Sequence, residues 1–128
     1  MKYILMMNAP KSGWDSFMSW PPEAIKRHIE FMKEFNKKLQ AQGEFVSAEG
    51  LTPPSEAKLV RAQKNGPPVI DGAFAETKEF LAGWWVVNVP NADRAYAIAA
   101  AASAAPGPDG EPFCIPIEVR AIGQAPEV

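Results

Sequence analysis

A turn and a short acidic segment that lead into a strongly apolar one constrain the fold more than any other part of this chain. Asp71-Gly72 is a turn dipeptide, because glycine adopts positive φ at no steric cost. The residues from Phe74 to Leu81 have helical spacing, and Gly83 is expected to end that short helix. Residues 84–89, Trp-Trp-Val-Val-Asn-Val, have the composition of a buried strand. The segment therefore predicts ionisable groups at the rim of a sheet.

The rest of the chain predicts alternating strands and helices. Apolar periodicity and Gly/Pro punctuation indicate a strand at residues 2–8, a helix from the Pro21-Pro22 start to about Gln42, a strand at 44–49, a hairpin at 58–63 and 68–70, a helix at 92–104 capped by Asn91, and a strand at 115–122. Residues 9–20 are expected to be a loop that carries three large aromatic side chains, Trp14, Phe17 and Trp20.

This order of elements is a βαββαβ arrangement with a hairpin and short-helix insertion. It predicts the α+β, ferredoxin-like fold, in which an antiparallel sheet carries both long helices on one face. We expect one domain over residues 1–128, with its core in about residues 1–122. The alanine-rich second long helix can lie close against the sheet.

The expected strand at residues 84–89 is apolar on both of its faces. Trp84 and Val86 alternate with Trp85 and Val87, whereas two helices on one side of a sheet cover only one face. An uncovered face of this size exceeds what monomers normally expose. We therefore expect a homodimer in which two sheets stack face to face.

Composition excludes several classes of partner. A net charge of −2 and a pI near 5.4 argue against a nucleic-acid-binding protein, and no apolar run approaches the roughly 20 residues that span a membrane. The single cysteine, Cys114, excludes an internal disulfide and suits the reducing cytoplasm, where we expect the protein. One histidine and one cysteine form no metal-binding pair, and Gly66-Pro67-Pro68 is not a phosphate-binding loop, so we expect neither metal nor cofactor.

Several stretches together resemble the YCII-related family, in particular its branch named for an Asp-Gly-Pro-Phe motif. They are Met1–Leu5, Glu49–Pro54 with Val60-Arg61, Asp71–Glu79, Leu81–Trp85 and Ile117–Arg120. The resemblance covers residues 1 to about 122, and Ala73 stands where the motif has proline.

The resemblance implies a dimeric α/β-barrel protein. A distant branch of the family includes a dehydrochlorinase of chlorinated hydroxymuconates, for which a His–Asp pair is the proposed acid–base machinery. By this resemblance, the chain is expected to be a cofactor-independent lyase-type enzyme that acts on a small organic acid. The alternatives are a non-catalytic dimer that binds or senses a small metabolite, and a purely structural dimer.

His28 is the candidate for proton transfer. It shares the apolar stripe of the first long helix with Ile25, Met32, Phe35 and Leu39. An imidazole can give or take a proton near neutral pH, and Asp71 or Glu49 would orient it. The alternative is a core histidine with a single hydrogen bond.

The remaining candidates are charged residues that could hold a substrate. Asp71, Glu76 and Lys78 could bind a small anionic or hydroxylated molecule, or could serve only the scaffold, with Asp71 capping the short helix. Glu49, at the end of a strand, can point into the cleft between the sheet and the first helix, and Arg61 could clamp a carboxylate.

Overall fold

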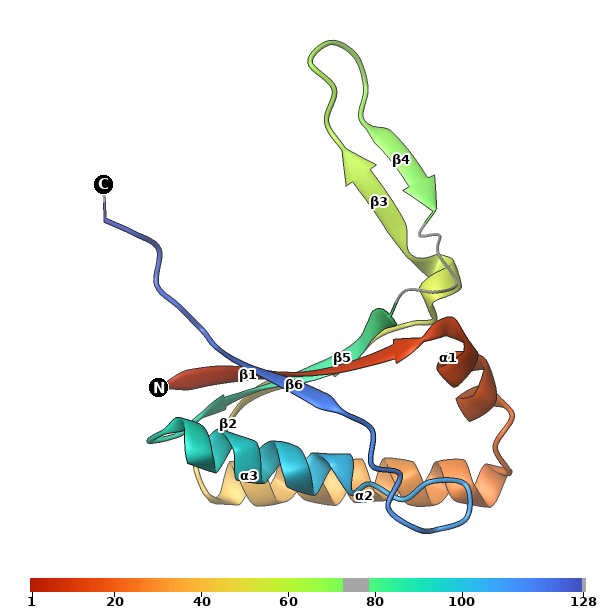
Figure 1. Cartoon of the computed structure of the whole chain (residues 1–128), viewed down its shortest axis with the longest axis vertical. Coiled ribbons are helices and arrows are strands. Elements are labelled where there is room, and N and C mark those ends of the chain that lie inside the picture. The colour runs from red at the N-terminus through yellow and green to blue at the C-terminus, as the bar shows by residue number, and fades with distance from the viewer. Residues whose placement is uncertain (73–78, 128) are drawn as a thin grey trace.

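The computed structural model describes residues 1–72 and 79–127 (Figure 1). Its elements in chain order are β1 (Lys2–Pro10), α1 (Lys11–Met18), α2 (Pro22–Ala41), β2 (Phe45–Gly50), the 3-10 helix η1 (Pro54–Glu56), β3 (Lys58–Arg61), β4 (Val69–Gly72), β5 (Glu79–Asn88), α3 (Ala92–Ser103) and β6 (Ile117–Ala121). No helix among these residues is long and apolar enough to cross a lipid bilayer.

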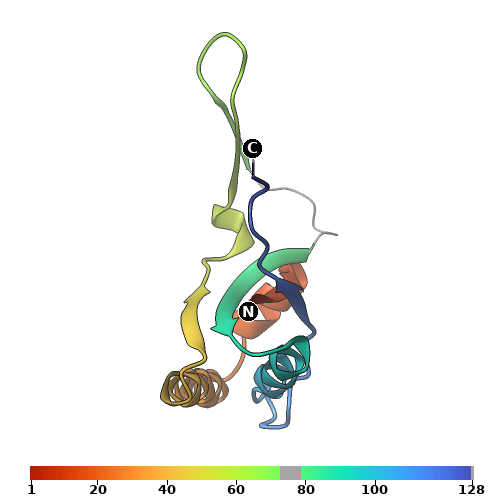
Figure 2. The same ribbon diagram turned by 90° about the vertical axis from the view of Figure 1, so that its left-hand side faces the viewer.

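Four strands form an antiparallel sheet in the order β2-β5-β1-β6, and α2 and α3 lie side by side on one face of it (Figures 1 and 2). The central strands, β1 and β5, are far apart in sequence and pair over their whole length. This is the split-βαβ order, and it confirms the predicted α+β, ferredoxin-like fold.

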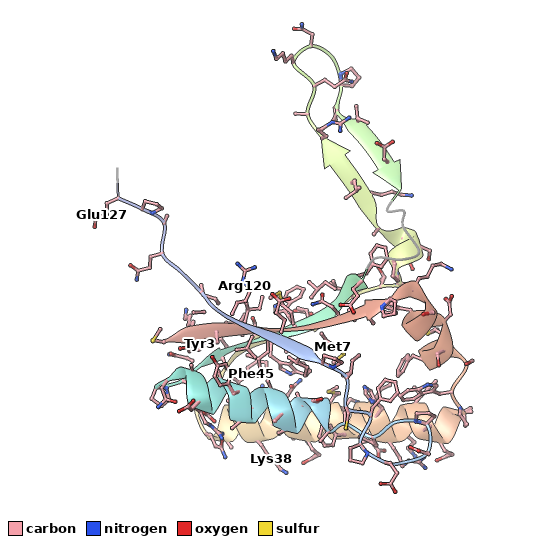
Figure 3. The ribbon with its side chains drawn as sticks, viewed as in Figure 1. Tyr3, Met7, Lys38, Phe45, Arg120 and Glu127 are labelled. Carbon is pink, nitrogen blue, oxygen red and sulfur yellow. The ribbon has the colours of Figure 1, made fainter. Side chains whose placement is uncertain are left out.

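The hydrophobic core lies between this sheet and the two long helices. Leu5 and Val87, from the two central strands, are 0 % exposed, and Figure 3 shows Tyr3 and Phe45 between the sheet and the helices. Small buried side chains, among them Ala95 and Ala102, bring α3 close to the sheet, as its alanine content predicted. The face opposite the helices, which we call the outer face, carries Ile4 and Met6 of β1 and Trp84 and Val86 of β5; these side chains are only half-buried.

The ends of the long helices follow the predicted signals. Asn91 caps α3, because its Oδ1 accepts a hydrogen bond from the backbone N–H of Arg94 at 3.0 Å. Beyond α2, Gly43 adopts a φ of 72°, which glycine tolerates, and the N–H of Glu44 then bonds to the carbonyl of Leu39 at 2.9 Å.

The prediction of a loop over residues 9–20 is wrong for most of that segment, because residues 11–18 form α1. Trp14 and Phe17 are three residues apart, so a helix places both on one side. Lys11 and Asp15 add an ion pair of 3.3 Å on the exposed side. The Ser, Gly and Pro residues of this segment suggested a loop, but the packing of its aromatic side chains outweighs their weak helix propensity.

The prediction of a short helix that Gly83 ends is wrong for the residues that the structure describes. Residues 79–83 belong to β5 and pair with β1, while the first part of the predicted helix lies outside the described residues. Gly83 is needed for a different reason: a Cβ atom there would lie 2.8 Å from the carbonyl oxygen of Glu49 on the neighbouring strand. Asp71 is likewise not a helix cap, since it lies in β4 opposite Leu59.

The predicted hairpin is confirmed. Among the described residues, strands β3 and β4 form a separate two-stranded sheet, and they project from the body of the molecule as an arm (Figure 1). Leu59, Val60 and Ile70 are 55 %, 65 % and 61 % exposed on it. An isolated two-stranded sheet is only marginally stable in water, and these side chains add apolar surface that the described part of the chain leaves uncovered.

An ion pair joins the start of β2 to the start of α3. Arg94 donates to both carboxylate oxygens of Glu44, from Nε and from Nη2, each at 2.7 Å, and Nη2 also reaches Gln42 Oε1 at 2.9 Å. These hydrogen bonds lower the pKa of the Glu44 carboxyl against the opposing effect of its burial. The pair therefore ties α2, β2 and α3 together at one end of the sheet.

Glu44→Gln is expected to lower the free energy of unfolding by about 1–3 kcal/mol at pH 7, the range for hydrogen bonds to charged groups. Because the folded-state pKa of Glu44 is lowered, its contribution is present above the unfolded-state value of about 4.3 and is lost as the pH falls through the folded-state pKa. Urea unfolding at pH 7 and in acid should show the two proteins converging below about pH 4. Glu34→Gln, which removes an exposed ion pair to Lys37, is the control and should cost no more than about 0.5 kcal/mol. A loss for Glu44→Gln that does not change with pH would contradict this account.

Candidate functional site

Two adjoining cavities open between the sheet and helices α1 and α2. The first has a volume of about 160 Å³ and an apolar lining that includes Trp14, Trp20 and Phe113. The second, of about 350 Å³, is lined in part by Asn36 and Glu49. Both cavities share the walls made by Met7, Phe17, His28 and Ala82, so they are two compartments of one cleft, which we call the His28 cleft.

The sheet and α2 place the shared walls of the cleft. On α2, His28, Met32 and Asn36 are spaced by four residues, so all three line the second compartment from one side of the helix. Opposite them, the pairing of β1 with β5 steps from Met7–Gly83 to Asn8–Leu81 and leaves Ala82 without a partner on β1. This bulge re-aims the strand, and Ala82 lines both compartments.

Aromatic rings surround His28 in the first compartment. The ring centroids of Phe17 and Trp20 lie 5.5 and 5.7 Å from the centroid of His28, both edge-to-face. Trp20 also meets Phe17 at 4.9 Å and Phe113 at 5.1 Å in the same geometry. Such contacts favour one orientation of each ring, so the compartment is pre-formed.

Trp14 contributes its ring to this compartment rather than its polar atom. Its Nε1 is buried and has no acceptor within residues 1–72 and 79–127. A buried atom cannot meet a ligand in the cavity unless α1 moves, so we assign Trp14 only an apolar contact.

A hydrogen bond to the backbone determines which nitrogen of His28 is available. Nδ1 lies 3.0 Å from the carbonyl oxygen of Pro106, in the segment that follows α3. A carbonyl can only accept, so Nδ1 carries the proton and donates it. In the neutral ring Nε2 then has a free lone pair, and it forms no hydrogen bond to the described residues and is not a buried atom. The cleft therefore contains one imidazole nitrogen that can accept a proton.

Asn36 is oriented in a similar way. Its Oδ1 accepts a hydrogen bond from Trp85 Nε1 at 2.8 Å, and an indole N–H can only donate. The amide NH₂ group of Asn36 is thereby left as a donor in a half-buried side chain that lines the second compartment.

Of the predicted site residues, the structure brings the side chain of His28 into the cleft. Glu49 lies at the edge of the second compartment, but it is exposed and pairs with Trp84, which directs its side chain to the outer face of the sheet. Arg61 and Asp71 lie on the projecting arm, in β3 and β4, and line neither compartment, so within one chain Asp71 is not a partner for His28. Glu76 and Lys78 lie outside the described residues.

Sequence reasoning did not assign Trp14, Asn36 and Phe113 to the site. Asn36 could have been found, because it lies two spacings of four residues beyond His28 on the same helix. Trp14 and Phe17 share a similar signal, which the assignment of a loop obscured. Phe113 gives no local signal, since backbone hydrogen bonds of its segment to Ala105 and Ser103 bring it to the cleft.

Within the described part of the chain, no group of three His, Cys, Asp or Glu side chains is arranged to hold a metal ion. Neither compartment is lined by a lysine or an arginine among these residues. The chemistry that the described lining itself offers is hydrogen bonding and proton transfer, through His28 and Asn36.

The fold and the cleft together define an α+β protein of the split-βαβ type with a small-molecule-sized site between its sheet and helices α1 and α2. Residues 1–107 match the model of the YCII-related domain, and the chain belongs to this family. It is also similar to a protein of Rhizobium meliloti (strain 1021) described as "Uncharacterized protein R00369", with 29 % identity over 77 residues. The matched region is 60 % of this chain and 62 % of that relative.

Proposed function

We propose that the His28 cleft binds a small organic molecule and that His28 transfers a proton there without a cofactor. The hydrogen bond from Nδ1 to the carbonyl of Pro106 carries this proposal, because it leaves Nε2 as a base in a pre-formed aromatic pocket. A positioned general base typically accelerates proton transfer about 10²–10⁴-fold.

In lyase-type chemistry, Nε2 would take a proton from the substrate, and the electron pair left behind would form a new double bond as a leaving group departs with its own electrons. The backbone carbonyl of Pro106 would hold the resulting imidazolium in place through the same Nδ1 hydrogen bond. The alternative, a binding module without turnover, would use the same donors and acceptors.

The tautomer of His28 tests this proposal directly. We expect the neutral ring to carry its proton on Nδ1, and long-range ¹H–¹⁵N correlation spectra can show this without overlap because the chain has one histidine. A neutral ring protonated on Nε2 would contradict the proposal, since it has no lone pair facing the cleft. His28→Gln and His28→Phe should both remain folded while losing proton transfer; turnover retained by both would equally exclude His28 as the base.

We also propose that the protein acts as a cytoplasmic homodimer in which two outer faces stack. The half-buried apolar side chains of that face and the exposed apolar residues of the arm support this assembly, since a partner would remove both sets from water. The part of the expectation that names an organic acid as the ligand has less support, because the described lining has no lysine or arginine to pair with a carboxylate.

A further inference from the structure

The first compartment of the His28 cleft has the size and lining of a site for a single ring. Its volume of about 160 Å³ is close to that of an engineered apolar cavity of about 150 Å³ that binds benzene. The rings of Trp20 and Phe113 pack edge-to-face in its wall, with their centroids 5.1 Å apart, and a flat apolar ligand can extend this packing.

The described side chains of the cleft offer both a hydrogen-bond acceptor and a donor. His28 Nε2 accepts in the neutral ring. The NH₂ group of Asn36 is the donor that the orientation of its side chain leaves free. A hydroxyl group suits both partners, because it can donate to His28 and accept from Asn36.

The same groups disfavour a carboxylate. A charged ligand would lose its hydration against aromatic walls, and burying an unpaired charge is strongly unfavourable. Among the described lining residues no lysine or arginine would compensate this loss.

We infer that the ligand of the His28 cleft is an uncharged ring compound with a hydroxyl group, its ring in the first compartment and its hydroxyl at His28. This inference rests on the proposed function, because it specifies the chemical class that the same site takes. It makes His28 Nε2 a determinant of specificity as well as a base.

Three probes of similar shape test the inference: phenol, toluene and benzoate. Titrations of the intact protein at pH 7.5, followed through the His28 ring and tryptophan indole signals, should give a Kd for phenol at least tenfold lower than for either other probe. His28→Phe keeps a ring in the wall but has no acceptor, so it should bind toluene as before and lose the tenfold preference for phenol. Ala9→Leu, which fills the first compartment, should weaken all binding at least tenfold, whereas Ala97→Leu on the exposed side of α3 should bind like the original protein.

The outcomes separate this inference from the proposal that it deepens. If benzoate binds at least as tightly as phenol and shifts the His28 signals, the ligand class is wrong and the site remains. If toluene matches phenol, the hydroxyl is not recognised, and the class is wrong again. If none of the three probes binds at 10 mM, or if all bind without affecting His28, both the class and the proposed site are overturned.

Discussion

Trp85→Ala is expected to lower the free energy of unfolding by about 3–5 kcal/mol, the range for truncating a buried aromatic side chain. Trp85 is 6 % exposed, and its ring packs edge-to-face on Phe35 with centroids 5.6 Å apart. The substitution would also remove the partner of Asn36 Oδ1. Urea unfolding followed by circular dichroism measures the loss directly.

Trp85→Phe separates the two contributions. It keeps most of the apolar ring and removes the indole N–H, so the loss of the hydrogen bond to Asn36 should dominate, at about 1–2 kcal/mol together with a small packing term. Because Asn36 would then be free to turn, binding in the second compartment should also weaken. A loss below 1 kcal/mol for Trp85→Ala would show that this side chain is not in the core.

Trp84→Glu is expected to convert a homodimer into monomers. Trp84 is the direct neighbour of Trp85 in β5, but it lies on the outer face of the sheet, whereas Trp85 lies in the core. Light scattering at micromolar concentration should give the original protein twice the 13.9 kDa of one chain, and the variant the mass of one chain or an aggregate. An unpaired charge buried in an interface costs several kcal/mol, and each 1.4 kcal/mol is a factor of ten, so dimerisation should weaken at least 100-fold.

Tyr96→Glu is the matched control, because Tyr96 is 55 % exposed on α3, on the other side of the sheet from the outer face. It should leave the dimer intact. A mass of one chain for the original protein would overturn the dimer proposal. A dimer that Tyr96→Glu disrupts and Trp84→Glu does not would move the interface to the helical side.

The sequence predicted the framework of the fold because the responsible signals are local. Apolar runs defined β1 and residues 84–88 of β5, a stripe at helical spacing defined α2, and the side chain of Asn91 defined the start of α3. Each signal lies within a few residues of the helix or strand that it specifies, so the amino-acid sequence is sufficient to find it.

Predictions about residues 9–20 and 79–83 were wrong where local composition and tertiary packing disagree. Ser and Gly in the segment of α1 argue for a loop, but Trp14 and Phe17 gain more from packing over the cleft than the helix loses in propensity. The spacing of residues 74–81 predicted a helix that ends at Gly83, yet pairing with β1 on one side and the close approach of Glu49 to Gly83 on the other hold residues 79–83 in a strand.

The candidate site shows the same difference between features that local sequence specifies and features that depend on tertiary contacts. The sequence by itself determined that the one histidine lies on the inner stripe of the first long helix, and it identified Glu49 at the end of a strand. Only the tertiary structure decided that Asp71 and Arg61 lie on a projecting arm, that Phe113 closes the aromatic wall, and that the carbonyl of Pro106 bonds to Nδ1 of a histidine 78 residues earlier in the chain. The physical reason is that the tautomer of an imidazole depends on the atom opposite it in space, and no periodicity or spacing near His28 specifies that atom.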